Sequence, residues 1–167
     1  MAGNYAEGTT VATSKSLEEI KSTLIRFGAN RDTFAYAEMG RRDAIQFRVG
    51  TREVRMEMLL PDREQFALDR YRRRRVETAI DKDWQQACRE YWRTLAVAVK
   101  AKLSMIEKGL STFDREFMAD LLLPSGETVG QQVIRDLDEA MATGELPPLT
   151  PRLGKPTNVI AIGERAG

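Results

Sequence analysis

The stretch TFAYAEMGRRDAIQFRVGTREVRMEMLL, residues 33–60, predicts a three-stranded antiparallel sheet. Two dipeptides within it, Gly40-Arg41 and Gly50-Thr51, suit two-residue hairpin turns, because glycine readily adopts the positive φ that the first turn position requires. The strands expected on either side of these turns are 33–39, 42–49 and 52–60. Each strand then pairs with the next one along the chain, which is the topology of a meander.

The two turns also determine which residues face each other across the strands. Apolar residues gather on one side, with the expected pairs Phe34–Phe47, Tyr36–Ile45, Ile45–Met56 and Phe47–Val54, and Val49 faces Arg52. The other side collects the polar residues Gln46, Arg48, Glu53, Arg55 and Glu57, with Arg48 opposite Glu53 as a favourable cross-strand pair. A shift by one residue would mix the two faces, so the alternation itself supports this register.

Apolar residues at three- and four-residue steps predict helices before and after the sheet. Ser16 and Glu19 match a capping box, so the first helix is expected at 16–27, where Gly28 ends it. The later helices are expected at 76–108, which is long, at 111–117, which is short, and at 129–142, after Thr128 as the cap. A short extended piece at Leu121–Leu123, closed by a turn at Pro124–Gly126, is expected before the last helix.

The predicted fold class is therefore α+β, and 167 residues suit a single domain. The expected organisation is a flexible N-terminus at 1–13, one domain at 14–144 and a proline-rich extended tail at 145–167. The apolar sheet face is expected to pack against the first helix and part of the long helix. The residues expected in this core are Leu24, Phe34, Ile45, Phe47, Val54, Met56, Trp84, Leu95 and Val99.

Composition excludes several kinds of chemistry. The chain has no histidine, which removes histidine-based triads, general bases and zinc ligands, and Cys88 is its single cysteine. Asp43 and Glu57 lie near each other at one end of the predicted sheet, but the lysine that a metal-dependent nuclease would place two residues after Glu57 is Leu59. No phosphate-binding glycine motif occurs. We therefore expect no enzyme, no metal and no cofactor.

Targeting signals are also missing from the sequence. The first residues lack a basic region followed by an apolar one, and no apolar run is long enough to cross a bilayer. The expected location is the cytoplasm of a bacterial host cell, with no membrane partner.

The strongest functional signal is the arginine-rich sequence RYRRRR at residues 70–75. Guanidinium groups suit phosphates and a tyrosine ring can stack on a base, so the candidate binding residues are Arg70, Tyr71, Arg72, Arg73, Arg74 and Arg75. Basic residues of the sheet region are candidates as well, namely Arg41, Arg42, Arg48, Arg52 and Arg55. Two other interpretations stay open: contact with an acidic protein, or a solvated loop tied to Asp62, Glu64 and Asp69.

Charge and apolar residues in the second half of the chain favour self-association. Residues 41–75 carry eleven Lys/Arg against six Asp/Glu, whereas residues 110–150 carry two against eight. Such opposed segments suit a head-to-tail homo-oligomer. The candidate interface residues are Tyr91 and Trp92 on the long helix, together with Val159, Ile160 and Ile162 in the tail.

The segments WQQACREYWR at 84–93, KAKL at 100–103, Phe113 with Glu116-Phe117, and LPSGETVG at 123–130 resemble a family of short, uncharacterised phage and prophage proteins. This resemblance implies a phage origin and a soluble single domain, and it carries no catalytic residues. A meander followed by a long helix is also loosely similar in topology to the core of phage single-strand annealing proteins.

The expected function is a non-enzymatic, phage-type accessory protein that binds nucleic acid, with single-stranded DNA favoured. The alternative is a protein–protein interaction module, either an inhibitor of a host defence component or a self-assembling phage structural protein.

Overall fold

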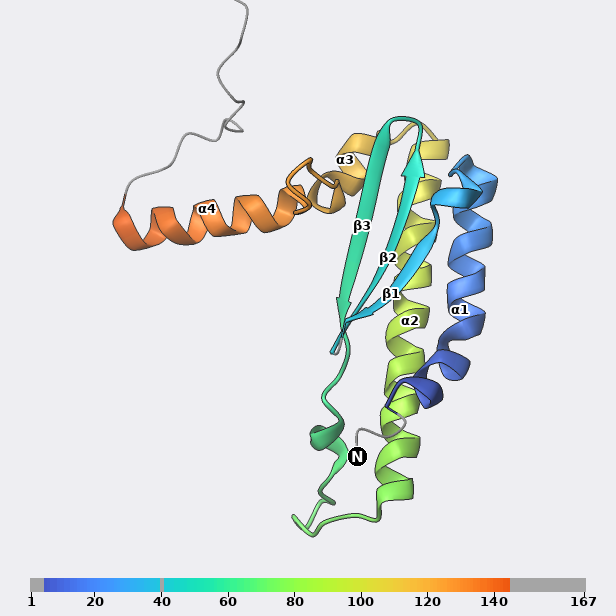
Figure 1. The fold of residues 1–167 in the computed structure, drawn as a ribbon, viewed down its shortest axis with the longest axis vertical. Helices are drawn as coiled ribbons and strands as arrows, with labels where there is room; N and C mark the ends of the chain where they lie inside the picture. Colours follow the sequence, from blue (N-terminus) through green and yellow to red (C-terminus); the bar gives the residue numbers. More distant parts are fainter. Residues whose placement is uncertain (1–4, 40, 145–167) are drawn as a thin grey trace, which may run out of the picture. The chain divides into compact units, whose positions relative to one another are not determined.

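The fold combines helices with one three-stranded antiparallel sheet in a computed structural model that describes residues 5–39 and 41–144 (Figure 1). The larger elements are α1 (Tyr5–Phe27), β1 (Ala35–Met39), β2 (Arg42–Val49), β3 (Arg52–Leu59), α2 (Glu77–Glu107), α3 (Phe113–Phe117) and α4 (Val129–Thr143). Three short 3-10 helices join them, namely η1 (Arg31–Thr33), η2 (Arg63–Phe66) and η3 (Met118–Asp120). The α+β class, the meander and the long helix are confirmed.

The sheet has the strand order β1-β2-β3 and the register that the sequence predicts. The observed pairs include Tyr36–Ile45, Ile45–Met56, Phe47–Val54 and Arg48–Glu53. The β2–β3 turn contains Gly50 at φ 58°, as a glycine-first turn requires. The first ladder begins at Ala35, one residue after Phe34, because the Phe34 N–H instead bonds to Arg31 at the end of η1.

The main core lies between one face of the sheet and the two helices α1 and α2, which run side by side behind it (Figure 1). Fully buried residues come from all three layers: Ile20 and Leu24 from α1, Ile45, Phe47 and Val54 from the sheet, and Trp92 and Val99 from α2. A smaller cluster of Leu60, Trp84 and Cys88 continues the core along α2. All predicted core residues are buried except Phe34 and Leu95, which are partly buried against the same cluster.

The predicted start of the first helix at residue 16 is wrong, because α1 already begins at Tyr5. Part of the segment 1–13 that was expected to be flexible is therefore helical. Gly8 and the β-branched residues near it have weak helix propensity, which made the segment resemble a tail, yet it contains no proline to stop a helix. The Ser16–Glu19 spacing that resembled a capping box lies inside the helix.

Beside β3 lies a short extended segment, and this pairing was not predicted. Leu121 forms a bridge with Val54, and the Leu122 N–H donates to the carbonyl of Glu53 at 2.8 Å. The chain then turns and enters α4 through a reciprocal cap: the Gln131 N–H donates to Thr128 Oγ1 at 3.2 Å, while the Thr128 N–H donates to Gln131 Oε1 at 2.9 Å. The predicted cap at Thr128 is confirmed, and Gln131 completes it.

Two units make up the chain, residues 1–131 and residues 132–167, and each is described by itself. The second unit contains most of α4, whose apolar residues Val133, Leu137 and Met141 are exposed. The predicted tail at 145–167, with Val159, Ile160 and Ile162, lies outside the described residues. Within residues 5–39 and 41–144, no helix has the length and apolar content needed to span a bilayer.

Candidate nucleic-acid interface

The arginine-rich segment forms a loop, residues 67–76, that connects η2 to the start of α2 (Figure 1). We call these ten residues the arginine loop. Its two arms pair with each other, because the Arg75 N–H donates to the Ala67 carbonyl and the Asp69 N–H donates to the Arg73 carbonyl, both at 2.9 Å. The segment therefore folds back on itself, with residues 70–72 at its tip.

Asp69 shapes this tip from inside the loop. Its Oδ1 accepts hydrogen bonds from the backbone N–H groups of Tyr71 at 2.8 Å and Arg73 at 2.9 Å, and its Oδ2 accepts one from Arg73 Nε at 3.0 Å. The backbone hydrogen bond from Arg73, above all, holds the pKa of Asp69 below its ordinary value. The predicted tie between the cluster and Asp69 is confirmed, whereas Asp62 pairs with Arg41 instead.

The tip contains a strained residue. Arg72 has φ 60°, and no other non-glycine residue in the described part of the chain has a positive φ. This conformation costs a residue with a Cβ roughly 1–2 kcal/mol. The hydrogen bonds to Asp69 hold it in place, and they direct the chain so that residues 70–72 project into solvent.

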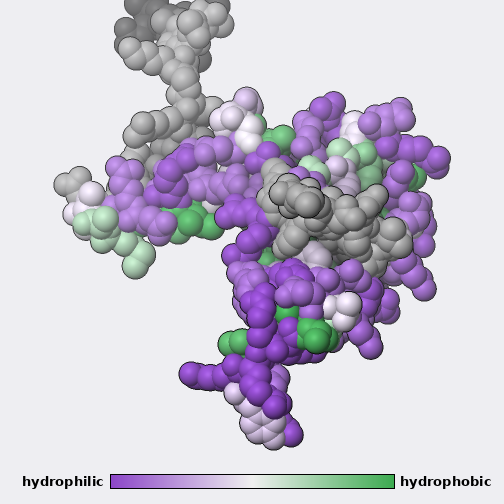
Figure 2. Space-filling view, turned by 60° about the horizontal axis from the view of Figure 1, so that its bottom comes forward, coloured by the Kyte–Doolittle hydropathy of each residue, from purple (hydrophilic) through white to green (hydrophobic). Residues whose placement is uncertain are grey.

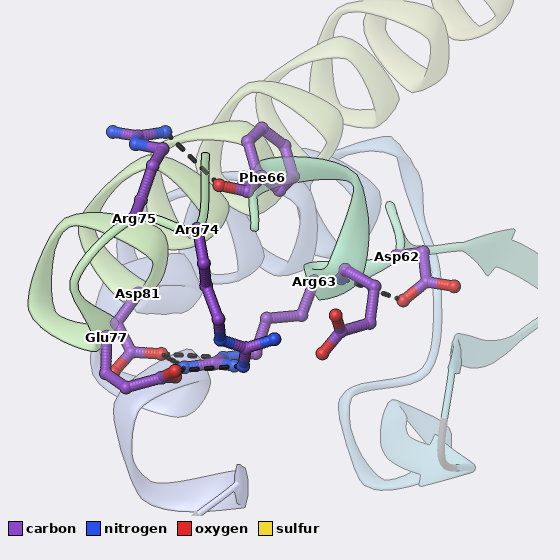
Figure 3. A network of polar contacts seen from close by, with 8 residues as sticks. Asp62, Arg63, Phe66, Arg74, Arg75, Glu77 and Asp81 are labelled. Carbon is purple, nitrogen blue, oxygen red and sulfur yellow. Dashed lines mark hydrogen bonds and ion pairs between the residues drawn. The ribbon is translucent and has the colours of Figure 1, made fainter. Parts of the chain in front are cut away.

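Acidic residues in the first turns of α2 anchor the second arm of the loop (Figure 3). Arg74 pairs with Glu77 at 3.0 Å and Arg75 pairs with Asp83 at 2.7 Å. Arg63, in η2, bridges both Glu77 and Asp81. These carboxylates also suit the positive end of the helix dipole, so the arginines that precede α2 are compensated there. Arg74 and Arg75 therefore hold the loop in place.

Tyr71 is the most conspicuous group at the tip. The residue is 62% exposed, and the guanidinium groups of Arg70 and Arg73 lie 4.6 Å and 5.2 Å from the ring centroid. Arg70 and Arg72 are exposed and form no ion pair with a described residue. The tip thus presents an exposed aromatic side chain and the exposed Arg70 and Arg72, which form no ion pair with a described residue. Figure 2 shows this end of the molecule as mostly hydrophilic surface with small hydrophobic patches.

The arginines of the sheet region are placed differently. Each forms an ion pair within the chain: Arg41 with Asp62, Arg42 and Arg55 with Glu57, Arg48 with Glu53, and Arg52 with Asp114. They lie along the strands and their ends, whereas the arginine loop lies beyond the sheet at the start of α2 (Figure 1). The structure does not gather the ten predicted arginines into one surface, and among them only Arg70 and Arg72, at the loop tip, form no ion pair with a described residue.

The prediction that Trp92 belongs to an oligomer interface is wrong, because this residue is fully buried within the chain. Its Nε1–H donates to Asp43 Oδ2 at 3.2 Å, and its ring meets Tyr36 edge-on at 5.5 Å between centroids. The buried stripe of α2 runs through Ile80, Trp84, Cys88, Trp92 and Ala96 in steps of four. This spacing places Trp92 in the centre of the stripe and leaves its neighbour Tyr91 exposed.

Asp43 is a buried carboxyl group, although the sequence suggested it only as a partner of Glu57 at one end of the sheet. It accepts hydrogen bonds from Trp92 Nε1 and from the Tyr36 hydroxyl, at 3.2 Å and 3.3 Å, and no arginine or lysine pairs with it in the described residues. Burial raises its pKa above the ordinary value, more than these two hydrogen bonds lower it. A nuclease site would need a pair of carboxylates that are both open to solvent. Asp43 is buried, so it does not form such a pair with Glu57.

We expect stability at neutral pH to be reduced by Asp43. The unfolded chain ionises this group near its ordinary pKa of 3.8, whereas the folded chain holds the proton to higher pH, so the free energy of unfolding falls as pH rises through that window. Asp43→Asn removes this pH-dependent contribution to the free energy of unfolding. Urea unfolding of both proteins is expected to show that the stability of the variant relative to the wild type increases from pH 4 to neutral pH. A relative stability that is constant or decreases would contradict the raised pKa.

Cys88 is expected to be unreactive in the folded protein. Its side chain is fully buried beside Trp84, and burial raises the pKa of the thiol to about 11, so little thiolate exists at neutral pH. A colourimetric disulfide reagent should therefore modify the native protein slowly and the urea-unfolded protein at once. Rapid modification of the native protein would show that this end of the core opens readily.

Among residues 5–39 and 41–144, no group of three or more histidine, cysteine or acidic side chains is arranged to hold a metal ion. Comparison of the chain with protein-family models, curated proteins and solved structures finds no match, so no relative assigns a function to the arginine loop.

Proposed function

We propose that this chain is a non-enzymatic accessory protein that binds single-stranded nucleic acid through the tip of the arginine loop. The observation that carries the proposal is the exposed Tyr71 side chain, with the guanidinium groups of Arg70 and Arg73 near its ring and the unpaired Arg72 next to it. A phage origin and the cytoplasm of a bacterial host belong to the same proposal.

The chemistry of the tip suits a strand with unpaired bases. An aromatic ring stacks on any base and contributes roughly 1–3 kcal/mol per base, without preference for sequence. Arginine donates two parallel hydrogen bonds to a phosphate, and it remains charged at every physiological pH. The bases of a duplex are already stacked on one another, so Tyr71 gains this contact only with a single strand. We therefore expect single strands to bind more tightly than duplexes.

The ion pairs of the loop define which arginines are available. Arg74 and Arg75 are engaged with carboxylates of α2, so we assign them to holding the loop. Arg70 and Arg72 are assigned to phosphate contacts, with Tyr71 between them in the sequence stacking on a base. Binding through two arginines and one ring is expected to be modest in affinity and sensitive to salt.

A second candidate function is contact with an acidic protein partner, of a host or of a phage. Leu68 and Val76 are exposed on the two arms of the loop, and apolar side chains gain little from a phosphate backbone. Tyrosine and arginine are also the residues most often found at the centre of protein interfaces. The partner in this case presents carboxylates around an apolar contact.

Fluorescence anisotropy with labelled single-stranded and double-stranded oligonucleotides at low salt tests the proposal. The expected result is saturable binding, tighter for the single strand. Absence of binding to both forms would reject it. A pull-down from bacterial lysate treated with nuclease then tests the second candidate, because a protein partner stays bound after nucleic acid is digested.

A further inference from the structure

Helix α4 presents an apolar stripe to solvent. Val133, Leu137 and Met141 follow one another at four-residue steps with Ile134 beside them, and these side chains are between 40% and 85% exposed. At about 100° per residue, the four positions fall within an arc of about 100° on one side of the helix. In Figure 2, hydrophobic side chains of this helix lie beside hydrophilic ones. An amphipathic helix of this kind ordinarily buries its apolar stripe against another surface.

Acidic side chains border this stripe on both sides. The same helical geometry places Asp138 next to Ile134 at one edge and Asp136 next to Ala140 at the other. Arg135, the single basic residue of α4, falls on the opposite side. The surface is therefore an apolar strip with an acidic residue at each edge, and it suits a partner that has positive charges beside apolar groups.

The arginine loop has the complementary composition. Leu68, Tyr71 and Val76 are exposed apolar or aromatic side chains, and Arg70 and Arg72 are exposed and unpaired among the described residues. Its residues 67–76 carry five arginines against one aspartate, whereas α4 carries three acidic residues against one arginine. Opposite charge around matching apolar groups gives specificity as well as attraction.

We infer that α4 of one copy of this chain docks on the arginine loop of a second copy. The apolar stripe covers Leu68, Tyr71 and Val76, while Asp136 and Asp138 face Arg70 and Arg72. Because the two surfaces differ, the contact is heterologous, and repeated contacts give a ring or an open chain of subunits. This inference does not rest on nucleic-acid binding. Both contacts use the same loop, so self-association is measured on protein freed of nucleic acid.

Two full-length variants isolate the two surfaces. A loop variant, Arg70→Ser/Tyr71→Ser/Arg72→Ser, removes the tip, and a helix variant, Ile134→Gln/Leu137→Gln/Met141→Gln, removes the stripe while keeping good helix formers. Circular dichroism confirms that each remains folded. Light scattering over a series of protein concentrations is expected to show a wild-type mass that rises above 18.9 kDa, and each variant alone at 18.9 kDa.

The mixture of the two variants gives the sharpest result. The loop variant retains α4 and the helix variant retains the loop, so together they form one contact and no more, and the expected mass is twice 18.9 kDa. A wild type that stays at 18.9 kDa overturns the inference. So does a loop variant that associates like the wild type, which indicates pairing of α4 with α4, or a mixture that stays monomeric while the wild type associates.

Discussion

Replacing Phe47 with alanine is expected to lower the free energy of unfolding by about 3–5 kcal/mol. Phe47 is fully buried in the central strand of the sheet, with Val54 as its cross-strand partner and the Phe117 ring edge-on at 5.9 Å. It belongs to the cluster that joins the sheet to α1, α2 and α3. Truncation leaves a cavity among rigid elements that collapse only in part, so most of the lost packing is not recovered.

Urea unfolding followed by circular dichroism measures this loss, and Tyr71→Ala is the matched control. The control also removes an aromatic ring, but that ring is exposed in the arginine loop, so its loss is expected to change the free energy of unfolding by less than about 0.5 kcal/mol. Equal effects of the two substitutions would contradict the assignment of the core to this face of the sheet.

Tyr71→Ala is expected to weaken binding to a single-stranded oligonucleotide about 5- to 140-fold, which corresponds to roughly 1–3 kcal/mol for a base stacked on an aromatic ring. The side chain lies at the loop tip and is 62% exposed, so a base that stacks on the ring takes the place of a guanidinium group or of solvent. Duplex binding should change far less, because the bases of a duplex are not free to stack on it.

Tyr91→Ala is the control for this second prediction. Tyr91 is also an exposed tyrosine, but it lies on α2 outside the arginine loop. It is expected to leave oligonucleotide affinity unchanged. If both tyrosine variants bind as tightly as the wild type, the stacking role of the loop is wrong. If both lose affinity equally, the contact extends over α2 or is not specific to the loop.

Much of the sheet and its cover could be predicted from the alternation of residues 42–60. Tight glycine turns leave a single register, and only that register places Ile45, Phe47 and Val54 on one side. The long helix was predictable for a similar reason, since its apolar period continues without a break between Val76 and Gly109. Both patterns involve residues that are close in the sequence, so they can be recognised without knowing the tertiary structure.

Other features depend on partners far away in the sequence. The steps of four from Ile80 through Cys88 lead to Trp92, but the sequence does not show that its indole N–H has a buried acceptor, because Asp43 lies far away in the chain. No pattern in the sequence predicts the pairing of Leu121 with Val54. In the same way, RYRRRR does not reveal which arginines find carboxylates on α2 and which remain unpaired.

The salt dependence of binding tests the central claim most directly. For single strands, the logarithm of the affinity falls with the logarithm of salt concentration by about 0.7 per phosphate contact. We expect Arg70→Ala/Arg72→Ala to reduce that slope by about 1.4, because both proposed contacts are lost. The control Arg26→Ala/Arg93→Ala removes the same charge from exposed positions of α1 and α2 and should keep the wild-type slope. Equal slopes for the wild type and the loop variant would contradict phosphate binding by the arginine loop.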